Sequence, residues 1–175
     1  MAKVLVIRLS AIGDVAMTVP VIYSAAKANP EDSFTVLTQA FLMPLFMNRP
    51  PNVEVIGINT KGAEKGLIGL LKFIFDVILD LHNVIRTIII CTFFRLNGKR
   101  VFVLDKARKE RKRLTAIKGK RLYPLRPVIV RYADVFRAAG LNYTETFTSL
   151  YEEFPAELSG MASVAGIKKG KWIGV

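Results

Sequence analysis

The fold of this chain is decided by one stretch near its N-terminus, KVLVIRLSAIGDV, residues 3–15. It opens with a continuous apolar run, Lys3 to Arg8, which is partly β-branched and typical of a parallel strand buried on both faces. A turn of small and polar residues, Ser10 to Asp14, follows. The Ala-rich apolar stretch from Val15 to Asn29 then predicts a helix. Strand, tight turn and helix in this order indicate an α/β domain.

Strand and helix signals continue to alternate along the chain. Strands are predicted at 33–38, 53–58, 76–81 and 101–104, and further helices at 40–47, 64–73, 83–96 and 128–139. Pro20 leaves two interpretations of the first helix: it lies in the first turn of a helix capped near Thr18, or it kinks a helix that begins at Asp14. The alternation predicts an α/β fold, a Rossmann-like parallel sheet with helices on both faces.

The composition fits a single domain with a substantial core. Of 175 residues, 51% are hydrophobic and 23% charged, which excludes a disordered chain and a coiled coil. The one cysteine, Cys91, lies in an apolar run and is expected to be a buried, inert thiol in a reducing compartment. The N-terminal apolar run is too short for a signal peptide, and the longer apolar stretches contain charges. Any membrane contact would therefore be peripheral.

Positive charge is concentrated in one segment. The chain carries a net charge of +12, and the segment 106–126 holds ten basic residues against the single acid Glu110, leaving +3 for the rest. Such a field attracts polyanions, such as a phosphorylated substrate, an anionic membrane surface or nucleic acid, unless the segment is only a solvated loop. Nucleic acid is disfavoured because the segment contains one aromatic residue, Tyr123, where single-strand binders stack several rings.

Two loops are expected at the carboxyl ends of the strands, where open α/β sheets bind ligands. In the first, Gly13 allows the backbone to approach a ligand closely, and Asp14 stands at a helix start. Asp14 is either a helix N-terminal residue stabilised by the helix dipole or a carboxylate that accepts a proton from a nucleophilic hydroxyl. The stretch lacks the three glycines of a dinucleotide fingerprint, and no phosphate loop of the G-x-x-x-x-G-K-[ST] type occurs.

The second loop, Asp80 to Arg86, holds the only histidine, His82, beside Asn83. Backbone N–H groups at a helix start and the Arg86 guanidinium together could hold an anion. The alternative for His82 is a turn residue that bonds its neighbours. One cysteine and one histidine do not supply the ligands of a usual metal site.

The motifs resemble those of glycosyltransferase family 9, the heptosyltransferases of lipopolysaccharide core assembly. Residues 3–15 followed by Pro20 resemble the opening of that family, and ILDLHN at 78–83 with Arg86 and Thr87 resembles its second motif. RYADVF at 131–136 with Gly140 and Leu141 is similar to its helix after the basic loop. The resemblance covers the chain to about Leu141.

The resemblance implies the N-terminal half of a GT-B enzyme, in which two Rossmann-like domains face each other across a cleft. It implies inverting, metal-independent transfer of heptose from ADP-heptose to the lipid A–inner core acceptor, with Asp14 as the base. No cofactor is implied beyond the ADP-sugar, which is a substrate. The partners would be the phosphorylated lipopolysaccharide precursor, the nucleotide sugar and the anionic inner face of the cytoplasmic membrane, and not nucleic acid. Candidate substrate-binding residues are Ser10, Gly13, His82, Asn83, Arg86, Lys106, Arg108, Lys109, Arg111, Lys112 and Arg113.

The predicted domain organisation follows from the same resemblance. Residues 1–170 would form the acceptor-binding domain, and residues 171–175 would begin a donor-binding domain that this chain lacks. We therefore expect the chain alone to be inactive in sugar transfer. A stand-alone α/β module that binds polyanions or a membrane surface is the alternative function.

Overall fold

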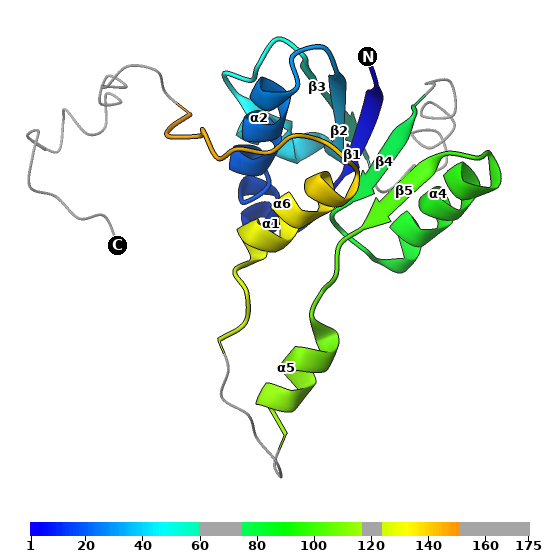
Figure 1. Cartoon of the computed structure of the whole chain (residues 1–175), viewed down its shortest axis with the longest axis vertical. Helices are drawn as coiled ribbons and strands as arrows, with labels where there is room; N and C mark the ends of the chain where they lie inside the picture. Colours follow the sequence, from blue (N-terminus) through cyan, green and yellow to red (C-terminus); the bar gives the residue numbers. More distant parts are fainter. Residues whose placement is uncertain (60–74, 117–123, 151–175) are drawn as a thin grey trace, which may run out of the picture.

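A parallel β-sheet forms the centre of the molecule in the computed structural model, which describes residues 1–59, 75–116 and 124–150. Within these ranges the sheet has five strands in the order β3-β2-β1-β4-β5 (Figure 1). The strands are β1 (Lys3–Ile7), β2 (Ser33–Gln39), β3 (Val53–Ile58), β4 (Val77–Asp80) and β5 (Arg100–Val103). This parallel order confirms the predicted α/β, Rossmann-like fold.

The apolar opening run lies at the middle of the sheet as β1. It pairs in parallel with β2 on one side, Val4 opposite Phe34, and with β4 on the other, Val4 opposite Val77. Successive side chains of a strand point to opposite faces, so Val4 and Val6 enter one hydrophobic core and Leu5 and Ile7 the other. An unbroken apolar run is therefore needed where both faces are covered.

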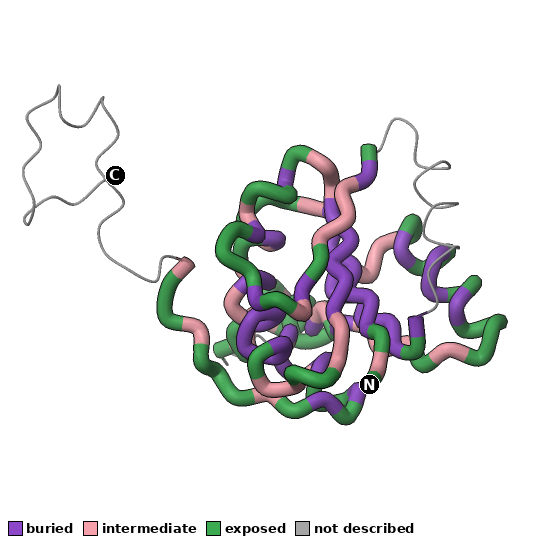
Figure 2. The backbone as a smooth tube through the Cα atoms, turned by 90° about the horizontal axis from the view of Figure 1, so that it is seen from above, coloured by how far each residue is buried: buried purple, intermediate pink, exposed green. Residues whose placement is uncertain are grey.

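Helices cover both faces of the sheet, as predicted (Figures 1 and 2). One core holds side chains from the helices of the first face, namely α1 (Ile12–Ala16), α2 (Val19–Ala28), the 3-10 helix η1 (Ala40–Phe46) and α6 (Val128–Ala138). The second core packs against α4 (Ile85–Leu96). Figure 2 shows the buried residues concentrated along the strands between these layers.

The structure resolves the two interpretations of Pro20. Thr18 is the N-cap of α2, and Pro20 lies in its first turn, where its missing N–H needs no partner. The prediction of one helix from Val15 was wrong, because a separate short helix, α1, already begins at Ile12 within the predicted turn. The Thr18 side chain bonds the carbonyl oxygen of Val15 at 2.7 Å and marks the break between the two helices.

The basic segment contains a helix that we did not predict. Helix α5 (Arg108–Leu114) has no buried residue and extends away from the sheet (Figure 1). Its regular backbone corrects the alternative of a charged loop for these residues. The predicted helix 64–73 and the predicted strand 171–175 lie outside the described residues. Within the described part of the chain, no helix is both long and apolar enough to cross a membrane.

Candidate functional site

The carboxyl ends of β1, β4 and β5 meet at one edge of the sheet, because the three strands are parallel neighbours. This edge brings together segments that are far apart in sequence. The Ser10 hydroxyl oxygen lies 3.3 Å from Nε2 of His82, although 72 positions separate the two residues. The Asn83 amide donates to the carbonyl oxygen of Leu104, just beyond β5, at 2.8 Å. The two predicted loops thus form one site.

Arg8 positions the Asp14 carboxylate. The Arg8 side chain leaves the end of β1 into a buried environment, where Nη1 donates to the carbonyl oxygen of Leu81 at 2.5 Å. Its guanidinium also lies 5.8 Å from the centre of the Tyr132 ring, a cation–π contact. The remaining Nη2 forms an ion pair with Oδ2 of Asp14, whose side chain is 42% exposed. The Asp14 carboxylate is therefore held by Arg8 through one oxygen, while part of the side chain remains accessible to solvent.

Asp80 shapes the second loop from inside the protein. Its side chain is fully buried at the end of β4, and Oδ1 accepts hydrogen bonds from the backbone N–H groups of His82 and Asn83 at 2.9 and 2.8 Å. Asn83 adopts a left-handed backbone conformation with φ of 49°, which asparagine tolerates better than most residues. A buried carboxylate bonded to two amides thus fixes the direction in which His82 and Asn83 leave the strand.

His82 is a neutral imidazole at physiological pH. Its partial burial, and next the positive charge of Arg8, lower the pKa of the ring to about 4. The negative charge of Asp80 opposes this shift and is outweighed. The ring therefore bonds Ser10 as an uncharged group.

Two adjoining cavities gather most of the predicted binding residues. The first, of about 450 Å³, is lined by Ser10, His82, Asn83, Arg86 and Arg108 among others. The second, of about 530 Å³, is lined by Asn83, Asp105, Lys106, Arg108, Lys109 and Glu110. The cavities share Asn83 and Arg108, so a single extended ligand could contact both. Their guanidinium and ammonium groups suit phosphate and carboxylate groups.

Lys106, which lines the second cavity, is a partly buried cation. Partial burial, and then the charge of Arg108, lower the pKa of the Lys106 ammonium below its ordinary value. A bound anion would offset both effects.

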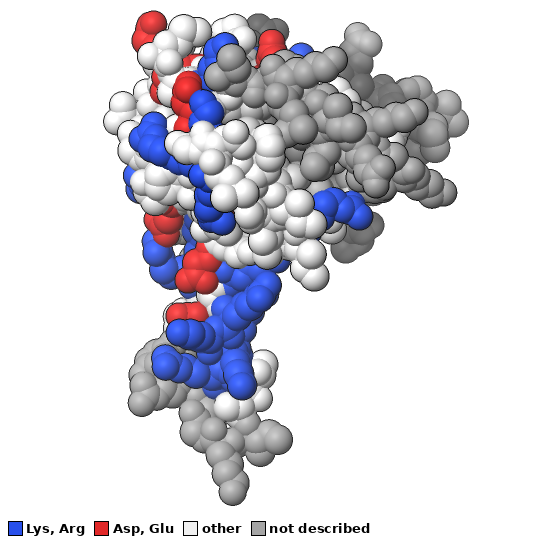
Figure 3. Space-filling view, turned by 90° about the vertical axis from the view of Figure 1, so that its right-hand side faces the viewer, with Lys and Arg blue, Asp and Glu red and all other residues white. Residues whose placement is uncertain are grey.

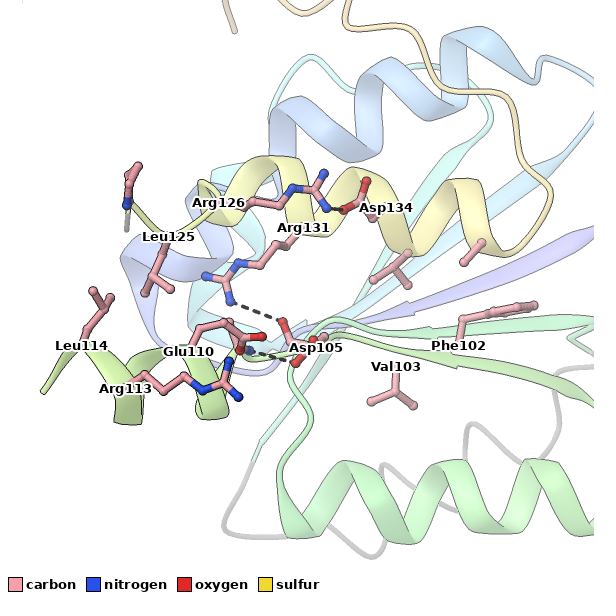
Figure 4. A pocket seen from close by; sticks show the side chains of 14 residues that line it. Phe102, Val103, Asp105, Glu110, Arg113, Leu114, Leu125, Arg126, Arg131 and Asp134 are labelled. Atoms are coloured by element: carbon pink, nitrogen blue, oxygen red, sulfur yellow. Dashed lines mark hydrogen bonds and ion pairs between the residues drawn. The ribbon is translucent and has the colours of Figure 1, made fainter. Parts of the chain in front are cut away.

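The remaining predicted residues lie elsewhere. Gly13 and Asp14 are not among the residues that line either cavity. A Cβ atom added at Gly13 would meet nothing within 4 Å, so contacts within the described chain do not require a glycine there. Arg113 lines a third cavity, of about 520 Å³, between α5 and α6 (Figure 4). Arg111 and Lys112 are exposed on α5.

Within the third cavity the charges largely compensate one another. Arg126 pairs with Asp134 at 2.7 Å, and Arg131 donates to the carbonyl oxygen of Asp105 at 3.3 Å (Figure 4). Glu110 lies beside Arg113 on the same wall. This cavity is therefore a weaker anion site than the two at the sheet edge. Among the described residues, no group of three His, Cys, Asp or Glu side chains could hold a metal ion.

Sequence reasoning missed the roles of Arg8, Asp80 and Tyr132. A signal for Arg8 existed, because an arginine that closes an otherwise apolar buried strand needs a partner, and Asp14 is the next acid along the chain. Asp80 gave a similar signal at the end of β4. Tyr132 could not be found this way, since α6 lies more than a hundred residues from Arg8 and only packing brings the two together.

Comparison with known structures supports the same fold. No protein-family model matches the chain, and no curated protein matches it in sequence. A family 9 glycosyltransferase from Veillonella parvula has 19% identity over 96% of this chain and 50% of its own, with a TM-score of 0.64. In fold, this chain is similar to a family 9 glycosyltransferase.

A second solved structure gives a similar result. The heptosyltransferase WaaC of E. coli with ADP has 21% identity over 84% of this chain and 49% of its own, with a TM-score of 0.57. A form of WaaC with ADP-2-deoxy-2-fluoro heptose has 20% identity and a TM-score of 0.56. The chain thus spans about half the length of the structures it matches.

Proposed function

We propose that this chain forms the acceptor-binding half of an inverting, metal-independent glycosyltransferase that transfers heptose from ADP-heptose. The observation that carries the proposal is the Asp14 carboxylate, held by buried Arg8 and open to solvent beside the carboxyl end of β1. The fold shared with a family 9 glycosyltransferase and with WaaC supports it.

In the proposed reaction, Asp14 acts as the general base. The oxygen of an acceptor hydroxyl forms a bond with the anomeric carbon of the donor sugar while Asp14 takes the hydroxyl proton. The bond from that carbon to the β-phosphate oxygen breaks, ADP leaves with the electron pair, and the anomeric configuration inverts. Arg8 is a positioning residue, because it is buried and acts through its ion pair with Asp14. No step requires a metal ion.

The acceptor is proposed to be the phosphorylated lipid A–inner core precursor of lipopolysaccharide. The cations that line the two sheet-edge cavities, Arg86, Lys106, Arg108 and Lys109, would bind its phosphates. The donor would bind mainly to a second domain. Because the acceptor is a lipid, the enzyme would work at a membrane surface, which we propose is the inner face of the cytoplasmic membrane.

The decisive experiment replaces the base in a polypeptide that joins this chain to a donor-binding domain. Asp14→Asn keeps the shape and a hydrogen bond to Arg8 but removes the proton acceptor. We expect kcat to fall by about a hundredfold or more, with KM for the acceptor little changed. Glu31→Gln, an exposed carboxylate outside the site, is the matched control and should leave kcat unchanged. Turnover of Asp14→Asn within about threefold of wild type would remove Asp14 from the mechanism.

One observation favours a second candidate function, a stand-alone module that binds anionic surfaces. Helix α5 extends from the domain with no buried residue, and five of its seven residues are Lys or Arg (Figure 3). Such a module would bind anionic vesicles through charge alone and release steeply with salt. If the joined polypeptide transferred no sugar while this chain still bound vesicles in that way, the module would be the better description.

A further inference from the structure

Helix α4 has an apolar face that points away from the protein. Its sheet-facing side is buried through Thr87, Ile90, Cys91 and Phe94. The apolar side chains of the opposite side are Ile85, Ile88, Ile89, Phe93 and Leu96, which we call the outer face of α4. Thr92 lies among them, and its hydroxyl donates to the carbonyl oxygen of Ile88 within the helix. At about 100° per residue, Ile85, Ile89 and Leu96 fall within about 40° of one another around the helix axis. Their exposed fractions are 81%, 61% and 83%.

The surroundings of this face are basic. Arg86 and Arg95 lie on its two flanks, and Lys99 and Arg100 follow the helix. No acidic residue occurs from residue 81 to residue 104. Ile85 and Arg86 line the same cavity as Arg108, so the basic helix α5 begins beside the first turn of the outer face. In Figure 3, which looks at this side of the molecule, uncharged surface lies above a column of Lys and Arg side chains.

We propose that the outer face of α4 inserts into the headgroup–acyl boundary of an anionic phospholipid bilayer, with the flanking arginines and α5 at headgroup level. Apolar side chains on one helix face with Lys and Arg at its borders are the pattern of helices that lie in a membrane interface. The inference deepens the membrane partner named in the proposed function and rests on it. It adds that apolar insertion, and not charge alone, holds the protein at the membrane.

Charge complementarity selects a lipid surface over a second copy of the chain. Two copies joined through this face would gather Arg86 and Arg95 of both copies around one interface, and like charges at an interface are unfavourable. Among the described residues, neither arginine forms an ion pair that would neutralise it. Anionic headgroups supply the missing charge, and the acyl boundary accepts the isoleucine and leucine side chains.

The test is sedimentation of the chain with vesicles of equimolar phosphatidylglycerol and phosphatidylcholine, at ionic strengths of about 0.1 M and about 1 M. The variant Ile85→Gln/Ile89→Gln/Leu96→Gln keeps good helix formers at exposed positions and should fold normally. We expect its vesicle partition coefficient to be lower by more than about tenfold at both ionic strengths. Wild type should retain measurable binding at high salt, because apolar insertion is not screened.

A matched pair of single variants controls for loss of any exposed apolar side chain. Ile89→Gln and Phe41→Gln remove side chains that are 61% and 68% exposed, but Phe41 belongs to η1, which packs on the opposite face of the sheet. Only Ile89→Gln should weaken vesicle binding. Equal effects of the two variants would overturn the assignment of the surface.

A fluorescent probe reports insertion directly. Burial raises the pKa of the Cys91 thiol to about 12, so a thiol-reactive dye at neutral pH labels a cysteine introduced by Ile89→Cys or, as control, by Phe41→Cys. An environment-sensitive dye should shift to shorter wavelength on vesicles at position 89 and not at 41. Unchanged vesicle binding by the triple variant would overturn the proposal, as would self-association that this variant abolishes. No readout uses sugar transfer, so failure here is separable from failure of the proposed reaction.

Discussion

Two basic regions of this molecule use charge in opposite ways. Arg8, at the end of β1, is buried, and its guanidinium has three defined partners: the Leu81 carbonyl, the Tyr132 ring and the Asp14 carboxylate. The basic side chains of α5 are exposed, and among the described residues none forms an ion pair. A buried cation must be paired and can therefore position another group, whereas exposed cations act through their summed field.

The largest effect should come from removing the buried cation. Arg8→Ala deletes the hydrogen bond to Leu81, the contact with Tyr132 and the ion pair with Asp14, and leaves a cavity. We expect the free energy of unfolding to fall by about 3 kcal/mol. Arg111→Ala on α5 is the matched control and should change it by less than about 0.5 kcal/mol. Urea denaturation followed by circular dichroism measures both, and similar values for the two variants would contradict the comparison.

A fall in pH is expected to have an intermediate effect on the free energy of unfolding, through protonation of His82. Because the folded pKa of His82, about 4, lies below its unfolded value of 6.5, the unfolded chain binds a proton first as the pH falls. The contribution of neutral His82 to stability is therefore complete above pH 6.5 and is lost as the pH falls to about 4. In NMR titrations the His82 ring signals should stay constant down to about pH 5.

The variant His82→Gln tests the same point through unfolding. It should flatten the fall in the free energy of unfolding between pH 6.5 and about 4. Arg111→Ala on α5 should leave that pH profile unchanged, since an arginine side chain keeps its charge throughout this range. A titration midpoint of the His82 ring near the ordinary pKa of 6.5 would contradict this prediction, because it would mean that the ring is exposed to solvent.

The smallest effect should come from Ser10→Ala. The variant removes a single hydrogen bond of 3.3 Å between partly buried side chains, and we expect a change in unfolding free energy of about 0.5 kcal/mol. Thermal unfolding of Ser10→Ala and of Arg8→Ala compares the losses of stability caused by the two substitutions. A loss as large as that of Arg8→Ala would show that Ser10, and not Arg8, anchors the loop.

Much of the layered fold could be predicted from local patterns. Apolar runs such as Lys3–Ile7 and Val77–Asp80 indicate strands covered on both faces, and Gly140, with φ of 82°, ends α6 as expected of a left-handed glycine. Where prediction failed, local signals were weak. Helix α1 is five residues long, and α5 is so highly charged that its composition equally suited a solvated loop.

Several residues of the candidate site were predicted from the sequence, but the contacts between them were not. Ser10 and Asn83 were expected in two loops, and parallel pairing of β1 with β4 brings these loops to one edge. The charge of Asp80 at the end of an apolar strand indicated that it needs a partner, but its partners, the two amides of the following loop, became clear only from the structure.

The sequence alone determined the class of the fold and the clustering of charge, because both follow from the order of residues along the chain. Runs of β-branched residues form strands. Lysines and arginines that are close in sequence produce one combined electrostatic field. Tertiary structure decided which groups meet. Strand order placed Ser10 beside His82, packing on α6 placed Tyr132 under Arg8, and the position of α4 at the edge of the second layer left its outer face exposed. These depend on contacts between distant segments, which no local pattern encodes.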